Sequence, residues 1–89
     1  MKAVITVAGR DTVGILAKVT GVCAECGVNV IDVSQTVMQD IFVMTMMSDI
    51  SKCPLPFDEF ADRFEPLRTA MNLQIHVMHE DIFNSMHRI

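Results

Sequence analysis

The sequence predicts an α+β fold of the ferredoxin-like type: a βαββαβ sandwich in which a four-stranded antiparallel sheet carries two helices on one face, followed by a short C-terminal helical tail. Four segments alternate apolar and polar side chains or are rich in β-branched residues, as strands are. Two longer segments repeat apolar residues every three or four positions, as helices do. In this order of elements, right-handed crossovers place both helices on the same face of the sheet. The 89 residues are expected to form a single domain, with the core at 1–79 and the tail at 80–89.

The first strand and the first helix follow from local patterns. Lys2–Ala8 alternates, and both of its faces are largely apolar, as expected for a strand in the middle of a sheet. The helix is predicted over Gly14–Cys26, with Asp11 or Thr12 as N-cap and Gly27 as the left-handed residue that ends it. Its apolar stripe consists of Ile15, Leu16, Val19, Val22, Cys23 and Cys26.

The next two strands form a predicted hairpin. Asn29–Met38 and Ile41–Ser48 are rich in Val, Ile, Thr, Phe and Met, which strands favour. Gln39 and Asp40 are the only turn residues between them, and a two-residue connection forces the two strands to run antiparallel.

The second half of the chain supplies a helix, a strand and the tail. A helix is predicted over Phe57–Met71, with a kink or a break near 62–66 because Pro66 removes a backbone hydrogen bond. Leu73–Met78 alternates again and is the fourth strand. Asp81 is expected to cap a terminal helix, and the sheet face opposite the two helices is left bare, open to water, the tail or a second subunit. The apolar stripe of that terminal helix consists of Ile82, Phe83, Met86 and Ile89.

Composition limits the classes of partner. Hydrophobic residues make up 51% of the chain and charged residues 20%, so some apolar surface is expected to be buried in a homodimer or higher homo-oligomer. The net charge of −4, with no Tyr, no Trp and no cluster of Lys or Arg, argues against nucleic acid and against an anionic membrane as partners. No apolar run approaches the roughly 18 residues that span a bilayer, and the start of the chain has no signal-peptide layout. The protein is therefore expected in the cytoplasm.

Thiols and histidines are the candidates for metal or redox chemistry. Cys23 and Cys26 have Cys-x-x-Cys spacing, but they fall on the apolar side of a helix end, which favours buried core thiols over redox or metal chemistry. The spacing of His76, His79 and His87 matches no metal-binding motif. No nucleophile with a base, no paired carboxylates and no cofactor loop can be assembled from the sequence. We therefore expect no enzymatic activity, no metal and no cofactor.

Two junctions stand out as candidate sites. Gly14 has no Cβ, so a ligand carboxylate could approach the amides at the helix start, where the helix dipole favours an anion. The alternative reason for this glycine is tight packing of the helix against the first strand. Asn29 could contact the same ligand or be a turn residue after Gly27, and Asp11 could contact it or be an N-cap. The junctions around Gly14 and Asn29 are expected to be neighbours in space.

These junctions resemble a known family. The motif Asp-x-x-Gly-Ile-Leu at 11–16 and the motif Gly-Val-Asn-Val at 27–30 resemble the two signature segments of ACT domains, small regulatory modules that bind amino acids. The resemblance implies that an amino acid is held at a dimer interface by Asp11, Gly14 and Asn29. The family often has Asn where this chain has Asp11, whose carboxylate attracts a ligand ammonium and repels a ligand carboxylate. The site that the resemblance implies consists of Asp11, Gly14, Ile15, Leu16, Asn29, Val30 and Asp32.

Two functions stay open at this stage. With its tail included, the chain resembles a small bacterial and archaeal family of free-standing ACT proteins, which implies a regulatory module that binds an amino acid or related metabolite at a homodimer interface. With no catalytic domain expected in the same chain, such a module would act on another, unknown protein. The alternative is an interaction protein that binds no ligand and uses the open sheet face and the tail.

Overall fold

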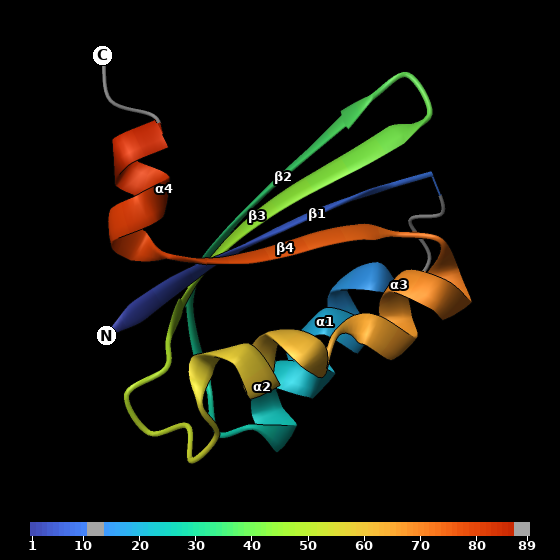
Figure 1. Cartoon of the computed structure of the whole chain (residues 1–89). Helices are drawn as coiled ribbons and strands as arrows, with labels where there is room; N and C mark the ends of the chain where they lie inside the picture. The colour runs from blue at the N-terminus through green and yellow to red at the C-terminus, as the bar shows by residue number, and fades with distance from the viewer. Residues whose placement is uncertain (11–13, 87–89) are drawn as a thin grey trace.

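The computed structural model describes residues 1–10 and 14–86, and it confirms the ferredoxin-like fold. Four antiparallel strands form one sheet in the order β2-β3-β1-β4. Figure 1 shows α1, α2 and α3 together on one side of this sheet and α4 on the other side. The elements are β1 Lys2–Gly9, α1 Ile15–Glu25, β2 Asn29–Met38, β3 Ile41–Asp49, α2 Phe57–Asp62, α3 Glu65–Met71, β4 Gln74–His79 and α4 Glu80–Met86.

The core lies between the sheet and the layer of α1, α2 and α3. Strand β1 is central, and Ile5 faces Met46 on β3 and Val77 on β4. The alternate side chains of β1 on this face are buried against Ile15 and Val19 of α1. Since residues directly opposite one another in adjacent strands share a face, the strand pairing sets which side chains enter the core.

The predicted second helix breaks where expected. Helix α2 ends at Asp62 and α3 starts at Glu65, with Pro66 in the first turn of α3, where a missing N–H costs no helical hydrogen bond. Phe60 in α2 and Phe64 within the break are both fully buried, and their rings meet edge to face with centroids 5.4 Å apart. Each buried ring stabilises the fold by about 1.5–3 kcal/mol before side-chain entropy is subtracted.

The far face of the sheet is covered at one end by the tail. Val4 points away from α1, α2 and α3, yet it is fully buried, because α4 packs on β1 and β4 there. The tail is therefore one of the groups that meet this face. The expectation that Asp81 caps the tail helix is wrong, because Asp81 lies inside the first turn of α4. There its negative charge interacts with the positive end of the helix dipole and stabilises the helix by about 0.3–1 kcal/mol.

The described helices are short, and none of those within 1–10 and 14–86 is long and apolar enough to cross a membrane. The longest of them, α1, has 11 residues.

The two edges of the sheet differ. At the β4 edge, Nε and Nη2 of Arg68 in α3 donate hydrogen bonds of 2.9 and 2.8 Å to the carbonyl oxygen of Ile75, and Nη1 bonds Glu65 at 2.7 Å. The Arg68 guanidinium thus takes up the carbonyl oxygen of Ile75, a backbone acceptor of this edge strand. The other edge strand, β2, has ten residues, of which only Val30 and Val33 are partly buried. A long exposed edge is a surface on which another strand can pair.

Replacing Arg68 with alanine should lower the free energy of unfolding by about 1–3 kcal/mol, because two charge-assisted bonds to a backbone carbonyl are lost. Urea denaturation measures this loss. Arg63→Ala is the matched control, since Arg63 is exposed and should change stability by no more than about 0.5 kcal/mol. Equal losses in the two variants would show that the bonds to Ile75 contribute nothing.

Candidate functional site

The start of α1 differs from the prediction. Gly14 is the N-cap residue, with φ 77° and ψ 1°, and its carbonyl oxygen accepts the first helical bond from the Lys18 N–H at 2.9 Å. The expectation that Asp11 or Thr12 is the N-cap is therefore wrong, although both lie outside the described residues. Glycine has no side chain that could bond the first-turn amides, so the N-terminal end of α1 carries no side-chain cap.

The reason for glycine at this position is backbone conformation. A Cβ on Gly14 would have no neighbouring atom within 4 Å, so the alternative of tight packing against the first strand is wrong. A positive φ of this size is one that residues with a Cβ rarely adopt. The following Ile15 is fully buried in the core, whereas Leu16 is 39% exposed. Open space is therefore present around a Cβ at Gly14, and no side chain caps the first turn of α1.

The other end of α1 follows the sequence prediction closely. Gly27 has φ 71°, and the N–H groups of Gly27 and Val28 bond the carbonyl oxygens of Ala24 and Cys23 at 3.2 and 2.8 Å. This pair of bonds is the Schellman motif, which satisfies carbonyls that a helix end leaves unpaired. Because Gly27 turns the chain sharply, Asn29 begins β2 directly after α1 ends.

Asn29 lines a small hollow of about 330 Å³, together with Gly27, Asp49, Ser51 and Lys52. The backbone N–H and the hydroxyl of Ser51 donate to the Asp49 carboxylate at 2.9 and 2.6 Å, and these bonds hold the pKa of Asp49 below its usual value. This end of α1 therefore presents a carboxylate, an amide and an ammonium close together.

The candidate site residues fall into two separate groups. Gly14, Ile15 and Leu16 lie at the start of α1, whereas the group at Asn29–Asp32 lies beyond its other end. An 11-residue helix is about 16 Å long, so the expectation that the two junctions are neighbours is wrong within one chain. The reason is that α1 runs back along the sheet, which puts its start beside the end of β1. Asp11, also a candidate, lies outside the described residues.

Within the second group, the residues differ in exposure. Asp32 is exposed, and one of its carboxylate oxygens accepts a 2.9 Å bond from the Val33 N–H. Val30 is partly buried against the core, and the strand is irregular between Val30 and Asp32. Asn29 and Asp32 are thus the members whose polar side chains can meet a ligand.

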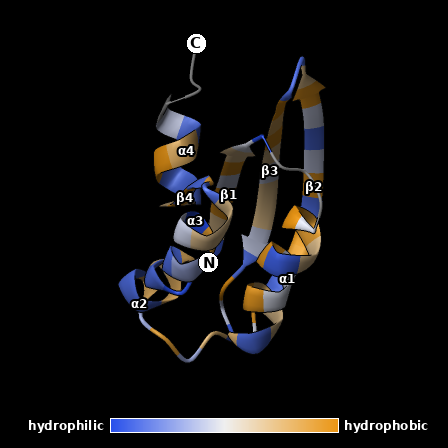
Figure 2. Ribbon diagram, turned by 90° about the vertical axis from the view of Figure 1, so that its right-hand side faces the viewer, coloured by the Kyte–Doolittle hydropathy of each residue, from blue (hydrophilic) through white to orange (hydrophobic). Residues whose placement is uncertain are grey.

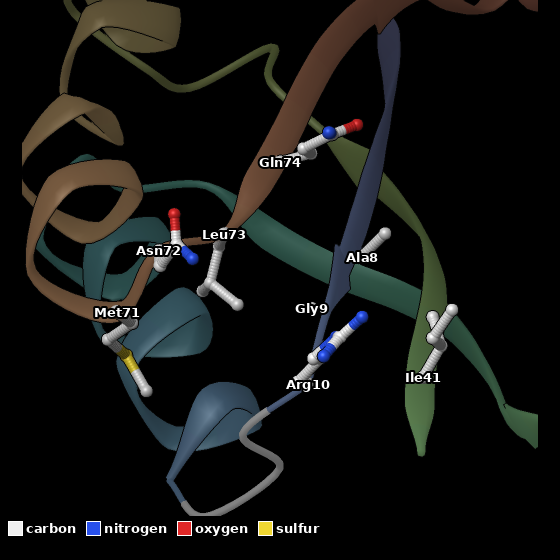
Figure 3. A pocket seen from close by; sticks show the side chains of 8 residues that line it. All are labelled: Ala8, Gly9, Arg10, Ile41, Met71, Asn72, Leu73 and Gln74. Atoms are coloured by element: carbon white, nitrogen blue, oxygen red, sulfur yellow. The ribbon is translucent and has the colours of Figure 1, made fainter. Parts of the chain in front are cut away.

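A larger pocket lies at the other end of the sheet and was missed from the sequence. Its volume is about 540 Å³, and it surrounds the end of β1 (Figure 3). Its lining comes from three segments far apart in the chain, so no local sequence pattern predicts it. Arg10, directly after the strand, is the one signal in the sequence. The lining residues are Ala8, Gly9, Arg10, Ile41, Met71, Asn72, Leu73 and Gln74.

Cys23 and Cys26 are core thiols, as predicted. Cys23 and Cys26 are 1% and 5% exposed, and Cys53 is half-buried. Burial raises the pKa of the Cys23 thiol to about 11, and burial likewise raises the pKa of Cys26. Both groups are therefore protonated at neutral pH, which makes them poor nucleophiles and poor metal ligands.

The histidines lie apart. His76 and His79 are on opposite faces of β4, and the ring of His79 packs on Phe57 with centroids 5.9 Å apart. No group of three or more His, Cys, Asp or Glu side chains within the described residues could hold a metal ion.

The fold and the two α1 junctions define a class of protein. The family described as the ACT domain matches residues 2–83, and the chain belongs to this family, whose members are regulatory modules that often bind ligands. Over nearly its whole length the chain is similar to a UPF0237 protein from Methanococcus maripaludis, with 46% identity over 86 residues, 97% of this chain and 96% of the relative.

Two solved structures support the assignment. An ACT domain protein from Streptococcus pneumoniae superposes with a TM-score of 0.80 and 38% identity, over 93% of each chain. The regulatory subunit of aspartate kinase from Thermus thermophilus, in its ligand-free form, superposes with a TM-score of 0.65 and 25% identity, over 85% of this chain and 49% of the other.

Substitution by alanine at two glycines of this region should have opposite effects. Gly14→Ala should destabilise the protein by about 1–2 kcal/mol, because alanine is strained at positive φ. Gly21→Ala should stabilise it by roughly 0.5–1 kcal/mol, since Gly21 lies inside α1 with open space around a Cβ. Thermal and urea denaturation measure both. A neutral Gly14→Ala would mean that the backbone there relaxes without strain.

Proposed function

We propose that this protein is a regulatory module that binds an amino acid or a closely related metabolite between two copies of the chain, and that the occupied dimer acts on another protein. The observation that carries the proposal is the separation of the two candidate groups. Each lies at one end of α1 and is open to solvent, and neither forms an enclosed site alone. A second copy is the simplest source of the missing half.

A second copy related by a two-fold axis supplies the missing half of the site. In a symmetric dimer the same surface of each copy meets its counterpart, with directions reversed. If two copies associate along the exposed edge strand β2, their α1 helices run antiparallel. Gly14 of one copy then approaches Asn29 of the partner copy, and two equivalent sites result. The Arg68 bonds at the opposite edge of the sheet support β2 as the edge that pairs.

The chemistry of the two halves fits a zwitterion. The first-turn amides of α1, which no side chain caps, lie at the positive end of the helix dipole and favour a carboxylate. The Asp32 carboxylate and the Asn29 amide oxygen can accept from an ammonium. A free α-amino acid carries both groups on one carbon and so can bridge the two halves. We propose Asp11, Gly14, Ile15, Leu16, Asn29, Val30 and Asp32 as the contacting residues.

The same proposal includes a cytoplasmic location and no catalysis. All three cysteines are free thiols, which suits a reducing compartment. The two most buried of them are held protonated, so they supply no nucleophile.

A thermal-shift screen of the twenty amino acids tests ligand binding, because a ligand that binds only the folded state raises the melting temperature. For the amino acid that binds, Asn29→Ala should weaken the affinity by about 1–3 kcal/mol, since the ligand loses a polar partner. Asn84→Ala, at an exposed position on α4, is the matched control and should leave the affinity unchanged. No shift with any amino acid, at ligand concentrations up to the millimolar range, would contradict the proposal.

A second candidate function is an interaction protein that uses its sheet face and binds no ligand. It is favoured by exposed apolar side chains on the hairpin of β2 and β3, and Figure 2 shows hydrophobic residues reaching the end of β2. These residues, with their exposed fractions, are Val37 61%, Met38 65%, Ile41 42% and Val43 37%.

Two lysine substitutions separate the two candidates. Ile31→Lys places a charge on the edge strand, where two-fold symmetry brings like charges together, and it should convert the dimer into a monomer. Val43→Lys changes the open face of the inner strand β3 and should leave the dimer intact. Sedimentation equilibrium at micromolar concentration gives both masses. If only Val43→Lys dissociates the dimer, the copies associate through the open face of the sheet. A monomeric wild type would reject association through the β2 edge and through the open face alike.

A further inference from the structure

We propose that the pocket at the end of β1 is a second binding site, for a small aliphatic carboxylate. The site lies within one chain and beside β4, at the edge of the sheet opposite β2. It does not depend on dimer formation and shares no residue with the amino-acid site proposed above. The proposal therefore stands or falls separately from the proposed function.

The polar part of the pocket is set by strand register. Ala8 on β1 pairs directly with Gln74 on β4, so the two side chains share the face of the sheet that points away from α1. Arg10 is two residues further along and returns to the same face. Figure 3 shows Ala8, Arg10 and Gln74 extending to the same side of β1. Since Ala8 carries only a methyl group, it leaves room between the guanidinium and the amide.

The charge of the lining selects an anion. Arg10 is the only charged side chain among the eight described lining residues. A guanidinium presents paired N–H donors that match the two oxygens of a carboxylate, and the Gln74 amide can add another donor. Because the whole chain has a net charge of −4, this cation is a local feature and not part of a general basic surface.

The apolar part of the pocket fits an aliphatic chain. Ile41 at the start of β3 is 42% exposed and extends to the same side as Arg10 in Figure 3. Met71 and Leu73 line the pocket around the end of β1, where Gly9 leaves space that Leu73 partly fills. The volume of about 540 Å³ is within the roughly 300–1,000 Å³ that small-molecule pockets occupy. A carboxylate over Ala8 would thus place its hydrocarbon body against Ile41.

The experiment is an NMR titration of the full chain with three probes: 4-methylpentanoate, its uncharged isostere 4-methylpentanamide, and acetate. We expect 4-methylpentanoate to give saturable shifts of the backbone amides of Arg10, Ile41 and Gln74. The amide probe should bind at least about tenfold more weakly because it loses the charge-assisted bonds, and acetate should bind more weakly because it lacks the hydrocarbon body.

Variants assign the contacts. Arg10→Gln should weaken 4-methylpentanoate binding at least about tenfold, and Arg10→Lys should be intermediate, since lysine keeps the charge without the paired donors. Arg63→Gln removes the same charge from an exposed position near Cys26 and should change the affinity by less than about twofold. Ile41→Ser should weaken 4-methylpentanoate and leave acetate unchanged.

Three results would overturn the proposal. The first is equal affinity of 4-methylpentanoate and its amide, and the second is equal affinity of the wild type and Arg10→Gln. The third is a set of shifts confined to 14–16 and 29–32, which would place the carboxylate at the amino-acid site and leave this pocket empty. A positive titration here together with a negative amino-acid screen would support this site and reject the proposed function.

Discussion

The structure depends on the burial of β1 from both sides. This strand pairs with β3 on one edge and β4 on the other, and its side chains on both faces are buried. Ile5 requires the layer of α1, α2 and α3, whereas Val4 requires α4 on the opposite face. The seven-residue tail helix is therefore part of the packing of the central strand, and loss of either layer would expose apolar surface in the middle of the sheet.

The position of β1 also decides where binding groups can lie. Since β1 is central and β2 is at the edge, the connection through α1 must pass the position of β3, and α1 runs the length of the crossover. One end of the helix thus meets the end of β1, and the other meets the start of β2. The two ACT signature segments occupy these two ends, so their joint action on one small ligand requires a second copy. In the proposed dimer, the unequal edges of the sheet favour pairing through β2.

The sequence was sufficient for features whose cause is local. Alternation and helical spacing identified four strands and two helical segments, and Gly27 was recognised as a helix end because the Schellman motif uses only neighbouring residues. Pro66 marked the break for the same reason, since its ring affects only its own turn. Such local sequence signals predict the same local structure in any tertiary context.

The errors arose where the cause is distant or hidden in the backbone. Gly14 looks the same in sequence whether it packs against a strand or adopts a positive φ, and only the observed conformation separates the two. Asp81 has the composition of a cap, but α4 starts one residue earlier, directly after β4 ends. The pocket around Arg10 combines β1, β3, β4 and the end of α3, so its lining appears only after the sheet order is known.

The two proposed sites are close along the chain, and this has a thermodynamic consequence. Arg10 ends the central strand, Gly14 begins α1, and only three residues separate them in sequence. A carboxylate held by Arg10 and an amino acid held beside Gly14 would act on opposite ends of one short connection. If binding of one ligand changes the affinity for the other, the reverse effect has the same size, because coupling between two binding equilibria is reciprocal. The sign of the coupling is set by the states that the ligands favour: ligands that favour the same conformation of the protein bind cooperatively, and ligands that favour different ones compete. The two proposals together let one small module sense two small molecules through residues that follow its central strand.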